Sequence, residues 1–372
     1  MLRVTTLHGM SSTYLEAVAE ALLPQSGSTV GVLYRRTGDA DAQVECVISD
    51  RWGTQETIPI TMGHDCLSCL VREHTYDTLR RLGEHDQWQH ALVTFPPGVD
   101  PSAFTQIVEY FQIEDEAAFK IVIDTCAVVA DIMLVETQVT SSALLREWGL
   151  SVVSTDERTM GEVAARQIEF ADVVLLANGE RASGARARRS ADLIRHLSPA
   201  ARIIPVDRDS VPASTCVGLG LFDSEDPKRL NPLTSQYCPT PIAGEITTTT
   251  WTARRPMHPA RFAEVVDEYM QDVIRGRGQL WLATSPTHQV GWESAGDSCS
   301  LALLDEWADV ATGAESHLVL VGRDIDFALM TRALDGCLLS AEEMAEDIAA
   351  WSTYENPFAR ILDITHEDED PS

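Results

Sequence analysis

Cations are scarce in this sequence, and their scarcity argues against one class of function. The chain of 372 residues has 28 Lys and Arg against 57 Asp and Glu, a formal net charge of −29. Proteins that hold nucleic acid neutralise its phosphates with clusters of Lys and Arg. We therefore expect no direct DNA contact, and the same charge disfavours direct RNA contact and binding to an anionic membrane. A protein partner, above all a basic one, and a metal cation stay compatible with it.

Long apolar runs are also missing. No stretch approaches the roughly 18 uninterrupted apolar residues of a membrane span, and the first residues lack the apolar run of a signal peptide. We therefore expect a cytoplasmic protein whose eight cysteines are reduced. Most of them, such as Cys46, Cys126 and Cys337, are isolated among apolar residues, where a free cysteine packs as a small hydrophobe. Cys66 and Cys69 form the one close pair.

The chain is long enough for two domains at roughly 150 residues each. Residues 1–206 alternate short β-rich runs with helical patterns, which predicts an α/β domain with a mostly parallel sheet and helices on both faces. Residues 207–244 contain five prolines and indicate a linker or irregular connection. Residues 245–340 predict a smaller α+β domain with several strands, one of them at Gln279–Ala283. Residues 341–372 form a C-terminal segment with an acidic tail.

Local patterns in the first domain set further expectations. The run Lys120–Asp124 predicts a buried strand that ends in a carboxylate. Ser154 and Glu157 have the spacing of a capping box, which predicts a helix that runs through Phe170. The stretch 35–74 is polar, and no element is predicted in it.

The loop after the first predicted strand is poorly suited to phosphate. A phosphate-binding loop needs glycines, whose backbone N–H groups face the phosphates, and a Lys. Here Gly9 is the only glycine, no Lys is present, and the loop is short. Ser11, Ser12 and Thr13 could touch an anion at the helix N-terminus, although capping the helix is the more common role of such residues.

The segment His64-Asp65-Cys66-Leu67-Ser68-Cys69 is the sharpest local signal. A C-x₂-C turn can place two thiolates on one Zn²⁺, with His64, Asp65 or His74 near enough to contribute. No second C-x₂-C completes a closed four-ligand site. Two alternatives therefore stay open, namely two cysteines in an ordinary turn and a redox pair.

Four segments of the second half resemble a known family. The run Arg254-Arg255-Pro256-Met257-His258-Pro259-Ala260-Arg261-Phe262 resembles the opening of the C-terminal domain of CobW-type proteins. Gly278–Thr284 resembles its Trp-containing strand, and Gly322–Asp324 and Ala333–Leu339 resemble its end. The family belongs to the SIMIBI class of P-loop GTPases, and many of its members are implicated in zinc or cobalt handling. The resemblance implies a P-loop-NTPase-like first domain.

The first half is similar to the family's GTPase domain in the order of its elements. Cys66–Cys69 matches the metal-linked C-x-C-C motif with Ser68 in place of the middle cysteine. Pro97–Pro101 resembles the segment after the Walker B strand, although Thr94 stands where an acidic residue is expected. The guanine-reading Asn-Lys-x-Asp is reduced to Asn178-Gly179-Glu180-Arg181. Without the Lys, the carboxylate and the base-reading Asp, GTP hydrolysis lacks its main electrostatic parts.

The resemblance therefore implies two sites and no catalytic residue. Zinc is the implied cofactor, whereas GTP and Mg²⁺ are disfavoured. The metal ligands would be Cys66, Cys69 and His64. The degenerate nucleotide site would comprise Gly9, Ser11, Ser12, Thr13 and Asn178.

This pattern is similar to an actinobacterial branch associated with zinc starvation, some of whose members resemble factors that recruit a hibernation protein to the ribosome. It implies a zinc-linked adaptor without GTPase activity that works through protein contacts, with a ribosomal or hibernation protein as partner. The alternative is a GTP-dependent zinc metallochaperone with an atypical nucleotide site. A thiol redox protein has little support beyond the C-x₂-C spacing.

Overall fold

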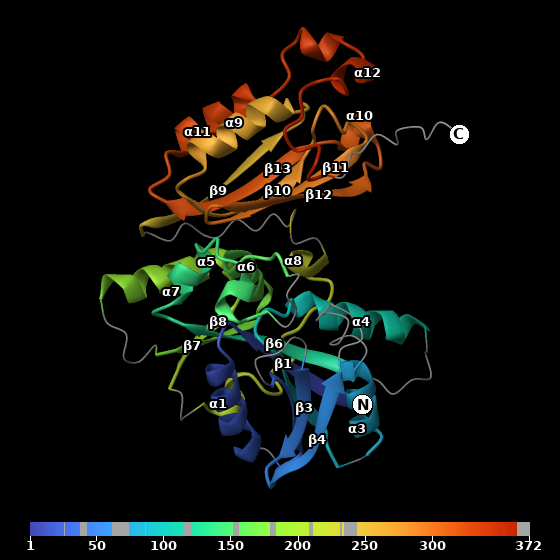
Figure 1. Cartoon of the computed structure of the whole chain (residues 1–372), viewed down its shortest axis with the longest axis vertical. Helices are drawn as coiled ribbons and strands as arrows, with labels where there is room; N and C mark the ends of the chain where they lie inside the picture. The colour runs from blue at the N-terminus through green and yellow to red at the C-terminus, as the bar shows by residue number, and fades with distance from the viewer. Residues whose placement is uncertain are drawn as a thin grey trace. The chain divides into compact units, whose positions relative to one another are not determined.

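The chain divides into two compact units, Met1–Arg229 and Leu230–Ser372, each described by itself below (Figure 1). No helix among the described residues is long and apolar enough to cross a membrane. The computed structural model describes residues 1–25, 27–37, 43–61, 74–85, 87–114, 121–151, 156–178, 184–207, 211–230, 233 and 244–362.

Unit 1 is built on an eight-stranded sheet in the order β4-β3-β2-β5-β1-β6-β7-β8 (Figure 1). The strands from β2 to β8 in this order are parallel, while β3 and β4 form an antiparallel hairpin at one edge. The strands are β1 (Leu2–Gly9), β2 (Thr29–Arg36), β3 (Gln43–Asp50), β4 (Gly53–Thr61), β5 (His90–Thr94), β6 (Ile121–Asp131), β7 (Val173–Ala177) and β8 (Arg202–Val206).

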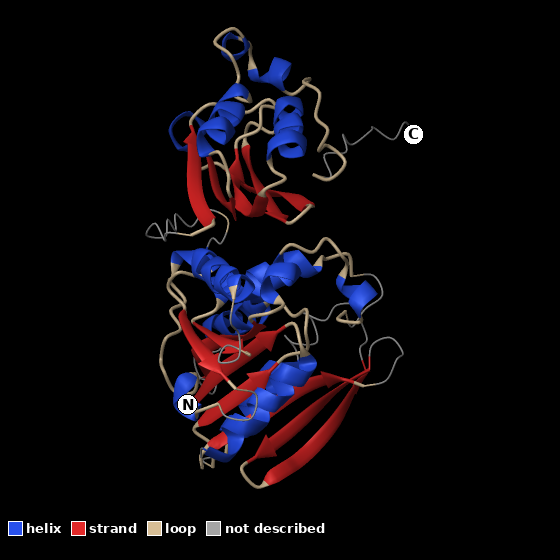
Figure 2. Cartoon of the chain, turned by 90° about the vertical axis from the view of Figure 1, so that its left-hand side faces the viewer, coloured by secondary structure: helices blue, strands red, loops and turns tan. Residues whose placement is uncertain are grey.

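Helices cover both faces of this sheet (Figure 2). The apolar stripe of α1 packs on one face with Leu7 and Leu175, whereas α3, α4 and the end of α6 close a second core on the other face with Val4 and Val93. The mostly parallel sheet with two covered faces is therefore confirmed. The helices of unit 1 are α1 (Ser12–Leu22), α3 (Tyr76–Gly83), α4 (Pro101–Glu114), α5 (Val135–Val139), α6 (Met160–Phe170), α7 (Ala185–Leu197) and α8 (Pro227–Leu230).

Two local expectations for unit 1 are wrong. The hairpin β3–β4 lies within the stretch for which no element was predicted, because polar residues interrupt the buried apolar residues of β3 and most of β4 is exposed. Helix α6 begins at Met160 behind the N-cap Thr159, whose Oγ1 accepts a hydrogen bond from the Glu162 N–H at 3.2 Å. The proposed capping residue Ser154 lies outside the described residues.

Strand β6 continues well past Asp124, where the sequence predicted its end. Asp124 lies inside the strand, and its carboxylate accepts hydrogen bonds from Arg3 at 3.1 Å and from the Thr125 hydroxyl at 3.0 Å. These two donors allow a carboxylate to be buried within a strand, since a buried charge needs hydrogen-bond partners.

Residues 211–229 follow β8 and pack against the rest of unit 1, and we call this segment the strap. Val211 and Cys216 are buried in the core that α1 closes. The N–H groups of Leu221 and Phe222 donate to the Asp124 carbonyl at 2.8 and 3.0 Å. The boundary between the units therefore lies after Arg229, inside the stretch 207–244.

Unit 2 has an antiparallel five-stranded sheet in the order β12-β11-β10-β13-β9 (Figure 1). Helices α9 and α11 close its core, which also takes in Phe358 and Leu362 near the end of the described residues. The elements are β9 (Ile246–Ala253), α9 (Pro259–Tyr269), β10 (Val273–Leu280), β11 (His288–Ala295), β12 (Ser298–Glu306), α10 (Val310–Gly313), β13 (Ser316–Arg323), α11 (Phe327–Gly336) and α12 (Ile348–Trp351).

One strand of unit 2 was predicted out of place. The sequence predicted it at Gln279–Ala283, but β10 begins at Val273 and ends at Leu280. Gly276 and Gly278 interrupt the apolar pattern of β10, although both positions are buried. The acidic run Glu367–Asp370 lies outside the described residues.

Candidate functional site

The turn between β1 and α1 lies where a phosphate loop would be. Only Met10 and Ser11 separate the two elements. Ser11 is the N-cap, and its Oγ accepts a hydrogen bond from the Tyr14 N–H at 3.4 Å. A Cβ atom on Gly9 would lie 2.7 Å from the Val129 carbonyl oxygen, so this end of β1 is pressed against β6. A phosphate loop of the G-x₄-G-K-[ST] type needs eight residues, and this turn has no room for them.

Asn178 lies directly after β7 and has a φ of 59°, in the left-handed region where Asn is one of the tolerated residues. Its side-chain Nδ2 donates to the Tyr14 hydroxyl at 2.7 Å and to the Asp131 carboxylate at 3.0 Å. The structure therefore brings Asn178 to the same sheet edge as the turn at Gly9 and Ser11. Both protons of its amide are already used by the protein.

His8 is the last side chain of β1 before this turn that carries a titratable group. Its ring stacks on Phe95 with centroids 5.1 Å apart, and neither ring nitrogen has a partner among the described residues. Burial lowers the pKa of His8 to about 4, against a smaller opposing effect of Asp100. The imidazole is therefore neutral at pH 7 and cannot replace the missing Lys.

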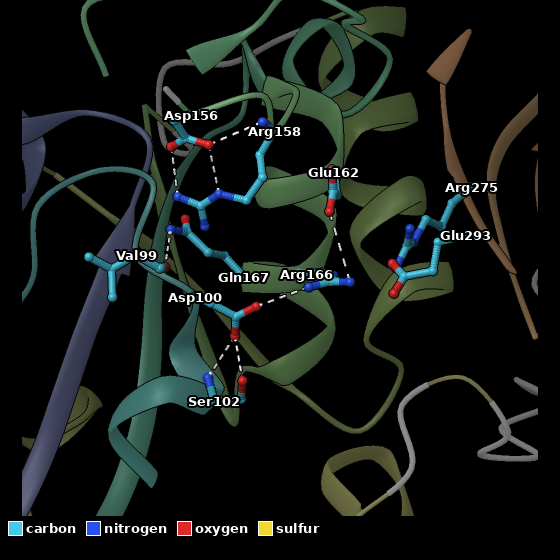
Figure 3. Close-up of polar contacts among 10 residues, drawn as sticks. All are labelled: Val99, Asp100, Ser102, Asp156, Arg158, Glu162, Arg166, Gln167, Arg275 and Glu293. Carbon is cyan, nitrogen blue, oxygen red and sulfur yellow. Dashed lines mark hydrogen bonds and ion pairs between the residues drawn. The ribbon is translucent and has the colours of Figure 1, made fainter. Parts of the chain in front are cut away.

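The segment after β5 is held in place by α6 (Figure 3). The Gln167 Nε2 donates to the Val99 carbonyl at 3.1 Å, and Arg166 donates to the Asp100 carboxylate at 3.2 Å. Asp100 also accepts from the Ser102 N–H at 2.9 Å, at the start of α4. The segment that the sequence analysis compared with the one after a Walker B strand is therefore fixed by side chains of α6 and by the start of α4.

A second ion pair lies beside these contacts (Figure 3). Arg158 donates two hydrogen bonds to the Asp156 carboxylate in a bidentate arrangement, at 2.9 and 2.8 Å. Although burial opposes it, hydrogen bonds and charge from Arg158 lower the pKa of Asp156. Sequence reasoning missed Arg166, because Arg166 and Asp100 are far apart in the sequence and no local spacing links them, and it did not single out the neighbouring pair of Arg158 and Asp156.

A pocket of about 90 Å³ opens beside the β1–α1 turn. Its two guanidinium groups are both engaged by the protein, since Arg35 pairs with Glu45 and Arg36 donates to the Gly149 and Ser151 carbonyls at 3.0 and 3.2 Å. Pockets for drug-sized ligands are about 300–1,000 Å³. The pocket therefore has room for several water molecules, not for a nucleotide. It is lined by Ser12, Leu15, Glu16, Leu33, Tyr34, Arg35, Arg36, Thr94, Phe95, Pro96, Pro97, Gly149 and Leu150.

The metal ligands expected from the sequence, His64, Cys66 and Cys69, lie outside the described residues. Within the described ranges no group of three His, Cys, Asp or Glu is placed to hold a metal ion. The first described residue after the cysteine pair is His74, whose Nδ1 lies 2.9 Å from the Tyr34 hydroxyl and 3.2 Å from the Thr78 hydroxyl. Burial is the largest of the influences that lower the pKa of His74.

Four isolated cysteines, Cys46, Cys126, Cys216 and Cys337, are buried, whereas Cys299 is exposed. Burial raises the pKa of the Cys46 thiol to about 11, and those of Cys126, Cys216 and Cys337 to about 12. Because the thiolate is the reactive form, these four cysteines are poor redox groups at neutral pH.

Comparison with known proteins gives matches for both units. Residues 246–338 match the family described as the cobalamin synthesis protein cobW C-terminal domain. A zinc chaperone of Mycobacterium tuberculosis is 26% identical over 93% of this chain and 90% of its own. The zinc-regulated GTPase metalloprotein activator 1 of Dictyostelium discoideum is 24% identical over 87% of this chain and 72% of its own. The Zn(II)-bound YjiA GTPase from E. coli covers 91% of this chain and 99% of its own, with 14% identity and a TM-score of 0.42.

The fold defines a class before it defines a family. The first unit, a mostly parallel sheet with helices on both faces, is of the α/β class, and the second unit is a smaller α+β unit with an antiparallel sheet. Residues 246–338 match the CobW C-terminal domain, and over most of its length the chain is similar to a zinc chaperone and to a zinc-regulated GTPase metalloprotein activator. The mostly parallel α/β fold expected from the sequence is confirmed, and these matches support the expected resemblance to CobW-type proteins.

Proposed function

We propose that this chain is a zinc-linked CobW-like adaptor that has kept the shape of a GTPase domain without its activity. The observation that carries this proposal is the two-residue turn between β1 and α1. A triphosphate needs a cradle of backbone N–H groups and a cation at this place. The turn leaves no cradle, and the buried His8 beside it is neutral at pH 7.

Two further features support the loss of GTPase activity. Thr94 stands where a carboxylate would position Mg²⁺, and the segment that follows is fixed to α6 by Gln167 and Arg166. In GTPases the switch segments become ordered or released with the γ-phosphate. A segment already held by side-chain contacts is poorly suited to that role, so we assign no step of the function to a nucleotide.

We expect the full-length protein to show no saturable binding of a fluorescent GTP analogue with Mg²⁺ up to millimolar concentration, and no GTP turnover above background. The reason is the absent phosphate cradle and the absent Lys. Fluorescence titration and phosphate release measure the two quantities, with the YjiA GTPase as the positive control.

Micromolar binding with turnover would contradict the adaptor and favour the second candidate, a GTP-dependent zinc metallochaperone with an atypical nucleotide site. The observation that favours this candidate is the similarity to proteins named as a zinc chaperone and as a zinc-regulated GTPase metalloprotein activator.

The zinc part of the proposal places the ion at Cys66, Cys69 and His64. Thiolate and imidazole are the ligands that Zn²⁺ prefers in proteins. We expect Cys66→Ser with Cys69→Ser to abolish tight zinc binding while the fold persists, since the buried cores do not depend on a metal. Zinc affinity should also fall as pH falls below neutral, because thiolate ligands must be deprotonated.

Zinc stoichiometry after dialysis and circular dichroism measure these two effects. Cys299→Ser is the matched control, because Cys299 is an exposed thiol of unit 2. A double variant that retains the zinc stoichiometry of the unaltered protein would contradict the assignment of the site.

The partner in this proposal is a protein, of the ribosomal or hibernation class. The chain carries a formal charge of −29. The arginines Arg254, Arg255 and Arg261 could form a basic edge for RNA, but Arg261 pairs with Glu343 at 2.7 Å and Arg254 with Glu315 at 3.3 Å. We expect binding to isolated basic ribosomal or hibernation proteins, with an on-rate that falls as salt rises, and no tight binding to naked ribosomal RNA. Tight RNA binding with a steep salt dependence would contradict this.

A further inference from the structure

Each of the two sheets has two edge strands among the described residues, and these strands differ in how they are protected. An edge strand leaves the N–H and C=O groups of alternate residues unpaired, and proteins commonly place proline or charged side chains on it. In unit 1, β4 carries Pro59 and β8 carries Pro205. In unit 2, β9 has few exposed residues, whereas β12 is mostly exposed and has neither proline nor charge before its last two residues (Figure 1).

Strand β12 therefore has an open edge. It pairs with β11 on one side, and no described strand pairs with its other side. The register with β11 is regular over residues 298–303 and shifts after them. This regular run is as long as an ordinary strand, so it can pair with an extended segment along its whole length.

The apolar core of unit 2 continues to this edge. Leu303 lies opposite Val290 of β11, and Val290 is buried in the core. Leu301, two residues earlier and on the same face of the sheet, is buried in that core as well. Leu303 itself is 44% exposed. A strand added at the edge would cover Leu303 with its own side chains, which adds apolar burial to the backbone hydrogen bonds.

The charge around the edge indicates what kind of segment fits. Residues 297–309 contain four carboxylates and no Lys or Arg. Burial, and after it the charge of Asp267 on α9, raises the pKa of the Cys299 thiol, so a further carboxylate lies near the strand. A second copy of the chain would bring the same carboxylates and a net charge of −29, which opposes self-pairing. A segment with Lys or Arg is attracted instead.

We propose that the free edge of β12, at residues 298–303, binds an extended basic segment of a partner protein as an additional strand of the unit 2 sheet. Backbone hydrogen bonds supply affinity, and Lys or Arg side chains meet the surrounding carboxylates. The inference rests on the proposed function, in which the chain works through protein contacts, and it adds the surface and the conformation of the bound segment.

The test titrates the full-length protein against a fluorescent peptide of about eight residues in which Lys and Val alternate, followed by anisotropy. Leu303→Lys should weaken binding at least about 10-fold, because it removes the apolar contact and places a repelling charge on the edge. Leu329→Lys is the matched control, since it adds the same charge at a 41% exposed position on α11. We expect it to change the affinity by less than about 2-fold.

A second peptide separates strand pairing from attraction between charges. The same sequence with every backbone N–H methylated keeps its charge and side chains but cannot donate hydrogen bonds to β12. It should bind at least about 10-fold more weakly, since several backbone hydrogen bonds are lost. Equal binding of the two peptides, or equal affinity of the two Lys variants, would overturn the edge site.

A measurement on the unaltered chain covers the case in which a variant fails to fold. Alkylation of Cys299, followed by mass spectrometry, should slow several-fold with saturating peptide, because Cys299 is exposed on β12. An unprotected Cys299, or self-association of the chain through β12, would overturn the proposal. Basic ribosomal or hibernation proteins that bind the unaltered chain and Leu303→Lys equally would overturn the edge site alone. GTP turnover alongside intact peptide pairing would overturn the adaptor function alone.

Discussion

Replacement of Asp172 by Asn is expected to lower the free energy of unfolding by about 3–5 kcal/mol, the loss found when one partner of a buried ion pair is removed. The Asp172 side chain is 6% exposed and pairs with the Arg229 guanidinium, whose side chain is 4% exposed. Its second oxygen accepts from the Cys126 N–H at 2.9 Å. Neutral Asn leaves the buried guanidinium without its counter-charge.

Arg229 has little access to another acceptor. Its guanidinium lies between the rings of Phe170 and Phe222, 4.8 and 4.1 Å from their centroids, and its Nε and Nη1 have no partner among the described residues. Urea unfolding followed by circular dichroism measures the loss. Asp192→Asn is the control, because its pair with Arg195 is largely exposed and should be worth less than about 1 kcal/mol. Equal losses in the two variants would contradict the argument.

Gly278→Ala is expected to disrupt the sheet of unit 2. A Cβ atom at this position would lie 2.0 Å from the His317 carbonyl oxygen and 2.9 Å from the Leu318 Cα, both on the neighbouring strand β13. These are backbone atoms, so relief requires β10 and β13 to separate. We expect a loss of about 3 kcal/mol or more, at the upper end of overpacking effects.

Thermal unfolding of the full chain, with limited proteolysis of unit 2, measures this change. Gly336→Ala is the matched control, since nothing lies within 4 Å of its Cβ position, and it should be neutral or stabilising by about 0.4–1 kcal/mol. A Gly278→Ala variant as stable as the control would show that the two strands can move apart without loss.

The strands and helices whose apolar residues recur at a regular spacing could be predicted from the sequence. The buried parallel strand β7 is a continuous apolar run, which indicates a sheet covered on both faces. The hairpin β3–β4 could not be predicted in this way, since its outer strand is mostly exposed and reads as polar. The start of helix α6 was predicted several residues too early, because Ser154 and Glu157 have a capping-box spacing while the actual N-cap is Thr159.

The surroundings of the candidate site could be predicted less well from the sequence than the fold. Residue types and resemblance were enough to single out Gly9, Ser11 and Asn178, but the contacts that define their surroundings join distant parts of the chain. Asn178 and Tyr14 are 164 residues apart in the sequence. No spacing rule links such pairs, so only the folded chain shows that the Asn178 amide is already satisfied.

The strap of residues 211–229 determines when unit 1 can complete its folding during synthesis of the chain. Val211 and Cys216 complete a core whose other buried members come from α1 and from the strands β1, β5, β6, β7 and β8, and Arg229 pairs with Asp172 at the end of the strap. A nascent chain that has only just emerged through β8 therefore still lacks part of its interior. Unit 1 reaches its final packing only once the strap has left the ribosome, when synthesis of unit 2 has already begun.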